Sequence, residues 1–245
     1  MLGHLSLASA SDLVREKRMY NQIVDAILDG DVKMLNADGH EFLSIYTEAE
    51  DAKGAVLILH GRGFHPDWAD VVNPLRVGLA EEGWNTLSIQ LPVLEKSAKY
   101  YDYVPIFNEA VPRIQVAIDY LKQQGNDKII LLAHSCGAHM AMQYVREKGE
   151  QDYDAFIGIG MGATDYKQPM REPFPFDRMS KPMLDIFGAD DYPAVHRLAA
   201  LRAQQMPGES NPLSRQVKIP QANHYFTDMG APLLEEVVAW LNELE

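Results

Sequence analysis

Ser135 stands in the sequence AHSCGA, in which the residues two before and two and three after it are alanine or glycine. Small neighbours allow a strand and a helix to pass close together, so the pattern predicts a sharp strand-to-helix turn that exposes the serine. A serine in that turn also lies at the N-terminus of the helix, whose dipole favours a developing oxyanion. We therefore expect Ser135 to act as a nucleophile.

Cys136, the only cysteine of the chain, and His134 flank this serine. A turn centred on Cys136 would put His134 two residues before the apex, where its side chain would clash. We expect the backbone N–H of Cys136 to donate to an oxyanion and its thiol to be a small buried packing group. We expect His134 to be structural, and His139 to serve packing or to face solvent.

A glycine-containing turn, His60-Gly61-Arg62-Gly63-Phe64, follows the apolar run Ala55–Leu59. A turn at this place in a parallel sheet can supply the second oxyanion N–H. The backbone of Arg62 or of Gly63 is expected to provide it, and the sequence does not choose between them. A plain glycine turn, or contact of the Arg62 side chain with an anionic substrate, are the alternatives.

The acid and the base of a catalytic triad are expected after two later strands. His224 follows the last apolar run and can act as general base towards Ser135. Asp191 is three residues beyond a glycine at the end of another run, and an acid there orients the imidazole. Asp190 is its rival, as a turn-stabilising residue or as the acid itself, and Asp165 is a third candidate.

The elements that must position these residues alternate along the chain. Apolar runs predict buried strands at Ala55–Leu59, Trp84–Ile89, Lys128–Ala133, Ala155–Ile159 and Pro182–Phe187, with a weaker one at Arg215–Ile219. Helical patterns separate them at Val71–Glu82, Val111–Gln124, Cys136–Glu147, Pro193–Gln205 and Ala231–Leu244. This alternation predicts an α/β fold with a mostly parallel sheet, helices on both faces and reactive groups at the carboxyl ends of the strands.

The N-terminal part has a different pattern. Ser11–Leu28 reads as an amphipathic helix capped by Ser11 or Asp12. Its expected buried face consists of Leu13, Val14, Ile23, Val24, Ile27 and Leu28. Val32–Leu35 and Glu41–Thr47 read as a hairpin around Asn36–Gly39. We expect residues 1–30 to be a tail and helix packed on a single catalytic domain at 31–245.

The motifs LILHGRG, LLAHSCGAH, LDIFGADD and QANHYF, each behind its own strand, resemble those of α/β-hydrolases. The resemblance covers the chain from about Val32 to its end, and there is a weaker similarity to a bacterial branch of unknown function. It implies an eight-stranded sheet whose second strand is antiparallel, and a triad in the order Ser135, Asp191, His224.

Two features bear on the substrate. The segment Gly162–Lys181 is too short for a large cap, so an open site is expected. The aromatic segment KYYDYVPIF is expected either to form a substrate wall or to pack in the core. The substrate-contacting side chains expected are Tyr101, Tyr103, Phe64 and Tyr225.

Composition limits partners and compartment. The net charge of −13 opposes binding to nucleic acid or acidic membranes. A single cysteine excludes an internal disulfide and a multi-cysteine metal site, and we expect no metal or cofactor. No apolar run is long enough to span a membrane. Ala8-Ser9-Ala10 resembles a signal-peptidase site without a proper leader before it, so we expect a cytoplasmic protein, or a periplasmic one if this is a precursor remnant.

The chemistry expected is cofactor-free hydrolysis of a carboxylic ester or related small acyl substrate through an acyl-enzyme. Acyl transfer, thioester cleavage and peptide cleavage can use the same triad. A binding protein that keeps the fold without turnover is the alternative from another class. The sequence indicates neither the substrate nor the oligomeric state.

Overall fold

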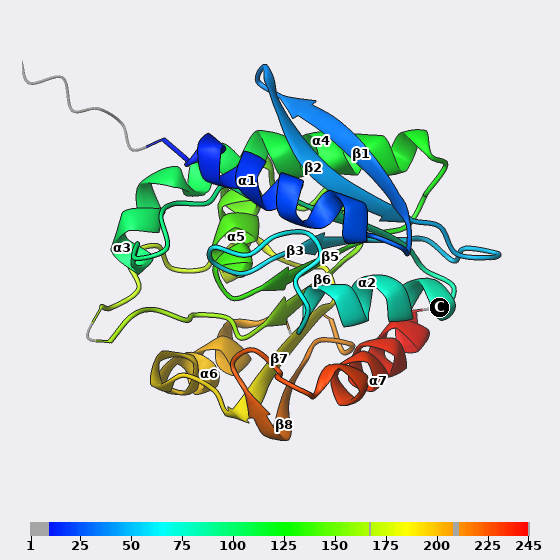
Figure 1. The fold of residues 1–245 in the computed structure, drawn as a ribbon. Helices are drawn as coiled ribbons and strands as arrows, with labels where there is room; N and C mark the ends of the chain where they lie inside the picture. The colour runs from blue at the N-terminus through cyan, green and yellow to red at the C-terminus, as the bar shows by residue number, and fades with distance from the viewer. Residues whose placement is uncertain (1–9, 167, 208–210, 245) are drawn as a thin grey trace, which may run out of the picture.

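The computed structural model describes residues 10–166, 168–207 and 211–244. Its strands form one sheet of eight in the order β1-β2-β4-β3-β5-β6-β7-β8 (Figure 1). Their bounds are β1 Asp31–Ala37, β2 His40–Thr47, β3 Ala55–Leu59, β4 Asn85–Ile89, β5 Ile129–His134, β6 Ala155–Ile159, β7 Met183–Asp190 and β8 Arg215–Asn223. Strand β2 is antiparallel to β1 and β4, and all other neighbours are parallel. This arrangement confirms the predicted fold class.

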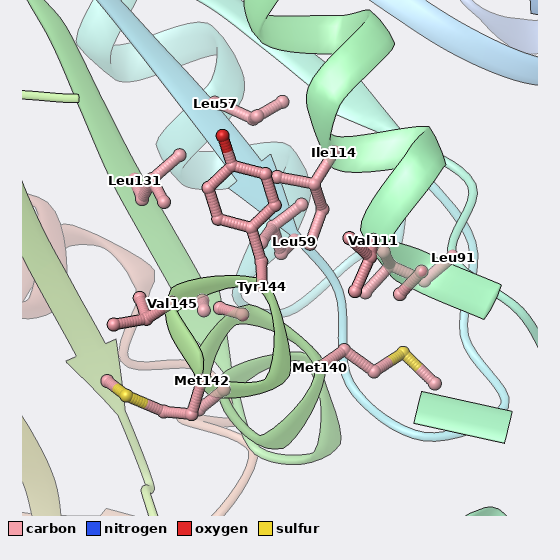
Figure 2. Packing of buried hydrophobic residues seen from close by; sticks show 14 of the residues in the cluster. Leu57, Leu59, Leu91, Val111, Ile114, Leu131, Met140, Met142, Tyr144 and Val145 are labelled. Atoms are coloured by element: carbon pink, nitrogen blue, oxygen red, sulfur yellow. The ribbon is translucent and has the colours of Figure 1, made fainter. Parts of the chain in front are cut away.

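Helices cover both faces of the sheet. Their bounds are α2 Val72–Glu81, α4 Ala110–Gln123, α5 Cys136–Lys148, α6 Pro193–Gln205 and α7 Gly230–Leu241. Successive residues of β3 enter different cores: Leu57 and Leu59 pack with α4 and α5, whereas Val56 and Ile58 pack with α2 and α7. Figure 2 shows the first core, where side chains of β3 and β5 meet those of the two helices. Both faces of β3 are buried, which explains why its residues form a continuous apolar run.

Helix α1 (Leu13–Ile23) and the short helix η1 (Val24–Ala26) occupy the predicted N-terminal helix, and Asp12 caps it. The predicted buried face is wrong for Leu13, Val14 and Leu28, which are exposed, whereas Ile23, Val24 and Ile27 are half-buried. Val14 is 77% exposed, whereas Glu16 and Met19 are the buried side chains of α1. Glu16 accepts hydrogen bonds from Arg113 of α4, with a shortest distance of 2.8 Å. A polar residue can occupy a buried helix face when it has such a partner, and the hydrophobic pattern cannot reveal it.

The aromatic segment after β4 is helical, with α3 at Tyr100–Tyr103 and η2 at Val104–Glu109. Tyr103 and Phe107 belong to the core rather than to an overhanging loop. Between β6 and β7 the only regular element among the described residues is η3, Phe176–Arg178, so no large cap covers the strand ends. Within the described part of the chain, none of the helices is both long enough and apolar enough to cross a membrane.

Candidate active site

Ser135 is the turn residue between β5 and α5, and its backbone has φ 54° and ψ −116°. This conformation is rare for a residue with a side chain and marks a strained turn. Gly137 makes the turn possible, because a Cβ on it would lie 2.6 Å from the Leu59 carbonyl oxygen and 2.5 Å from that of His60. Helix α5 therefore passes so close to the end of β3 that only glycine fits, as the small-residue pattern predicts.

His224 connects Ser135 to Asp191. Its Nε2 lies 2.8 Å from Ser135 Oγ, and its Nδ1 lies 2.6 Å from Asp191 Oδ1. The carboxylate can only accept, so Nδ1 carries the proton and Nε2 is left to accept the serine proton. All three side chains are buried. The structure thus brings together three residues that are separated by up to 89 positions in the sequence.

Asp191 is the acid that faces this imidazole. Burial favours a higher pKa for its carboxyl group, but the hydrogen bonds from His224 and from the Tyr192 N–H outweigh it and hold the pKa below the usual value. Asp190 pairs with Asn223 in the β7–β8 ladder and is exposed. Asp165 binds Arg62 instead, at 2.5 Å. Of the three predicted acids, only Asp191 is placed to keep His224 in the tautomer that a general base needs.

The thiol of Cys136 is buried, and burial raises its pKa to about 12. A neutral thiol is a poor nucleophile. The backbone N–H of Cys136 is the first of α5, so no carbonyl of its own helix can accept from it. The sulfur of Cys136 therefore stays protonated, whereas its backbone amide is available as a donor beside Ser135.

The turn at Arg62 and Gly63 is held from two sides. The His60 ring accepts from the Leu91 N–H through Nε2 (3.0 Å) and donates through Nδ1 to the Gly61 carbonyl (2.7 Å). Burial lowers the pKa of His60 to about 3, so the ring stays neutral and can play both parts. From the other side, the Arg15 guanidinium of α1 donates to the Gly63 carbonyl at 3.1 Å.

The two histidines near Ser135 are hydrogen-bonded to backbone and are not joined to the serine. His134 Nε2 lies 2.9 Å from the His224 carbonyl oxygen, and burial lowers the pKa of His134 to about 3. It therefore supports the loop that carries His224. His139 Nε2 donates to the Ala163 carbonyl at 3.2 Å, and burial lowers its pKa to about 4.

A cavity of about 250 Å³ opens beside Ser135 and His224. Of the four side chains expected to contact the substrate, Phe64 and Tyr225 line this cavity, whereas Tyr101 and Tyr103 do not. The Tyr103 hydroxyl accepts from the Leu94 N–H at 2.9 Å inside the core, and the Tyr101 ring lies under the Arg171 guanidinium. Tyr100 of the same segment reaches the cavity instead. The helical backbone of α3 decides this, because it sends successive side chains in different directions.

Three features of the site were not predicted. Tyr192 stacks on His224, with ring centroids 4.2 Å apart and planes at 22°. Gly160, at φ 60°, leaves the space into which His224 fits, since a Cβ there would lie 2.9 Å from the imidazole. Asp165 and Arg62 join two loops across the cavity. Only Gly160 gave a signal in the sequence, as a glycine directly after a buried strand.

Among the described residues no group of three or more histidine, cysteine, aspartate and glutamate side chains is arranged to hold a metal ion. The family model described as "Protein of unknown function (DUF3530)" matches residues 12–105 and 105–242. No curated protein matches the sequence.

Solved structures are similar to this chain in fold. Est1E from Butyrivibrio proteoclasticus has 16% identity and a TM-score of 0.67, covering 88% of this chain and 98% of its own. An alpha-beta serine hydrolase homologue from Coxiella burnetii has 19% identity, a TM-score of 0.66 and coverages of 87% and 98%. Dienelactone hydrolase from Anabaena variabilis has 19% identity, a TM-score of 0.66 and coverages of 88% and 97%. The α/β-hydrolase fold expected from the motifs is confirmed.

Proposed function

The chain belongs to the DUF3530 family of proteins of unknown function, and from its site we propose that it is a serine hydrolase of carboxylic esters or related small acyl compounds. One observation carries the proposal: Ser135 Oγ, His224 and Asp191 form a continuous hydrogen-bonded chain at the edge of a cavity. In this proposal residues 31–245 are the catalytic domain, and the helix within residues 1–30 packs on it.

The first half-reaction forms an acyl-enzyme. Ser135 Oγ attacks the ester carbonyl while His224 Nε2 takes the serine proton, and Asp191 stabilises the imidazolium that results. The backbone N–H groups of Cys136 and of Arg62, with Gly63 as the alternative to Arg62, donate to the tetrahedral oxyanion. His224 then returns the proton to the alcohol, which leaves with the electrons of the broken C–O bond.

The second half-reaction releases the acid. A water molecule gives a proton to His224 and attacks the acyl carbon, and collapse of the second tetrahedral intermediate returns Ser135 to its starting state. The exposed mouth of the cavity gives water a route to the acyl group. No cofactor takes part in either step.

Two further observations favour turnover over a purely binding role. The strained backbone of Ser135 persists although it is energetically unfavourable, and such strain is concentrated at functional sites. The structures of similar fold include an esterase from Pyrococcus furiosus, Est1E with ferulic acid bound, and a serine hydrolase homologue. These neighbours make ester cleavage the reaction to test first.

Ser135→Ala decides the proposal. With p-nitrophenyl acetate, kcat/KM should fall by about 10⁴-fold or more, because the nucleophile is lost while the fold is kept. A fluorophosphonate probe should label the natural protein and not Ser135→Ala. Cys136→Ala is the matched control, since it removes the neighbouring thiol and leaves the amide. Labelling that survives in Ser135→Ala and disappears in Cys136→Ala would show that the serine is not the nucleophile.

A further inference from the structure

Arg197 is a cation at the mouth of the cavity, and no described residue forms an ion pair with it. It lies on α6, in the first half of the helix, and its side chain is exposed. Among the described residues the other arginines, except Arg18, form a hydrogen bond, an ion pair or a ring contact, and Arg197 forms none. An arginine without a partner beside a reactive centre is available to a ligand.

The charge of the cavity differs in sign from that of the whole protein. The chain carries a net charge of −13. The charged side chains lining the cavity are Arg62, Arg197 and Asp165. Asp165 is fully engaged, since it accepts two hydrogen bonds from Arg62 and one from the Tyr100 N–H, with Lys99 Nζ at 3.9 Å. The charge left over in the cavity is therefore the positive charge of Arg197.

Two phenols that line the same cavity as Arg197 supply a second donor. The hydroxyl groups of Tyr192 and Tyr225 lie 2.5 Å apart, and both rings line the cavity. Two hydroxyl groups have two protons, and one proton is enough for the bond between them. The other phenol proton remains free to donate. Tyr192 directly precedes α6, so the donor and Arg197 come from the same short piece of chain.

We propose that the natural substrate carries a carboxylate at the end away from its scissile ester, and that Arg197 binds it. This inference rests on the proposed hydrolase function and adds the chemical class of the substrate. A planar carboxylate matches the fork of N–H donors of arginine. In a concave site the attraction between two charges is less screened than on open surface. The cavity volume of about 250 Å³ suits a compact substrate of this kind.

The test compares a charged ester with its neutral analogue. For a carboxylate on the alcohol side, the pair is 4-acetoxybenzoate and methyl 4-acetoxybenzoate. For a carboxylate on the acyl side, it is monomethyl adipate and dimethyl adipate. The measured quantity is the ratio of kcat/KM for the charged ester to that for the neutral one, which cancels differences in leaving group when variants are compared.

In Arg197→Gln this ratio should fall about fivefold to tenfold for at least one pair, the range between an exposed ion pair and a charge-assisted hydrogen bond. Arg18→Gln is the matched control, because Arg18 of α1 is also an exposed arginine without a partner among the described residues, and it does not line the cavity. Its ratio should match that of the natural protein. An unchanged ratio in Arg197→Gln for both pairs, or an equal fall in Arg18→Gln, would overturn the proposal.

A binding measurement separates this inference from the hydrolase proposal. Calorimetric titration with 4-hydroxybenzoate and with methyl 4-hydroxybenzoate needs no turnover. The acid should bind more tightly than its methyl ester, and Arg197→Gln should remove the difference. If this holds while neither ester is cleaved, the anion site stands and the hydrolase proposal fails. If both esters are cleaved through Ser135 but Arg197→Gln does not weaken the binding of 4-hydroxybenzoate, the anion site is refuted and the hydrolase proposal stands.

Discussion

Replacing His139 by glutamine should flatten the dependence of stability on pH. His139 is buried between the rings of Tyr100, Phe107 and Phe174, and its Nδ1 has no hydrogen-bond partner among the described residues. Burial lowers its pKa from 6.5 to about 4. Below the ordinary pKa the unfolded chain takes up a proton that the folded protein refuses, so acidification favours unfolding.

The magnitude follows from the pKa difference. Between about pH 7.5 and about pH 5.5, one such histidine should remove about 1.4 kcal/mol from the free energy of unfolding. His60 and His134, whose pKa values are lowered by burial to about 3, have the same sign, so the three together should remove about 4 kcal/mol. Glutamine at position 139 does not titrate and can still donate to the Ala163 carbonyl.

The assay is urea unfolding of the natural protein and of His139→Gln at both pH values. Burial raises the pKa of Glu16 and of Asp185, which gives a trend of the opposite sign in both proteins, so the difference between the two proteins is the decisive quantity. His40→Gln is the control, because His40 lies exposed at the start of β2. Retention of the full pH dependence in His139→Gln, or equal flattening in His40→Gln, would show that the buried imidazole of His139 is not its source.

Asp191→Asn should lower kcat/KM by about 10³-fold to 10⁴-fold with a p-nitrophenyl ester, because asparagine favours the wrong imidazole tautomer. Asp190→Asn, an identical change at the exposed neighbour, should stay within about twofold, and an equal loss in both would contradict the assignment. Gly160→Ala should lower kcat by about 10²-fold, since the added Cβ would lie 2.9 Å from the His224 imidazole and displace it. Kinetics like those of the natural protein would show that the imidazole is not confined there. Cys136 should resist iodoacetamide in the folded protein at about pH 9 and react in urea, because burial raises its pKa to about 12. Mass spectrometry measures this, and rapid alkylation of the folded protein would contradict the buried neutral thiol.

The local sequence determined most of the framework. Buried parallel strands need apolar residues on both faces, so β3 and β6 were predicted with their observed bounds at Ala55–Leu59 and Ala155–Ile159. The small neighbours of Ser135 predicted its turn because strand and helix contact there sterically, within a few residues. The strand ends then placed His224 and two adjacent acids on one edge of the sheet. Ala8 and Ser9, on which the compartment prediction rested, lie outside the described residues.

Contacts between distant residues decided the rest. The sequence left Asp190 and Asp191 as rivals, and the irregular register between β7 and β8 near Gly188 sends one into the ladder and the other to His224. The buried side of α1 depends on Arg113, 97 residues after Glu16, so no local period could give it.

The aromatic surroundings of His224 also depend on the tertiary structure. Tyr192 stacks on the imidazole because α6 starts beside the loop after β8. The residue types and their order thus indicated the chemistry of the site. The walls of the site, the tautomer of His224 and the lack of a partner for Arg197 among the described residues exist only in the folded chain, because each depends on distances between residues that the sequence keeps apart.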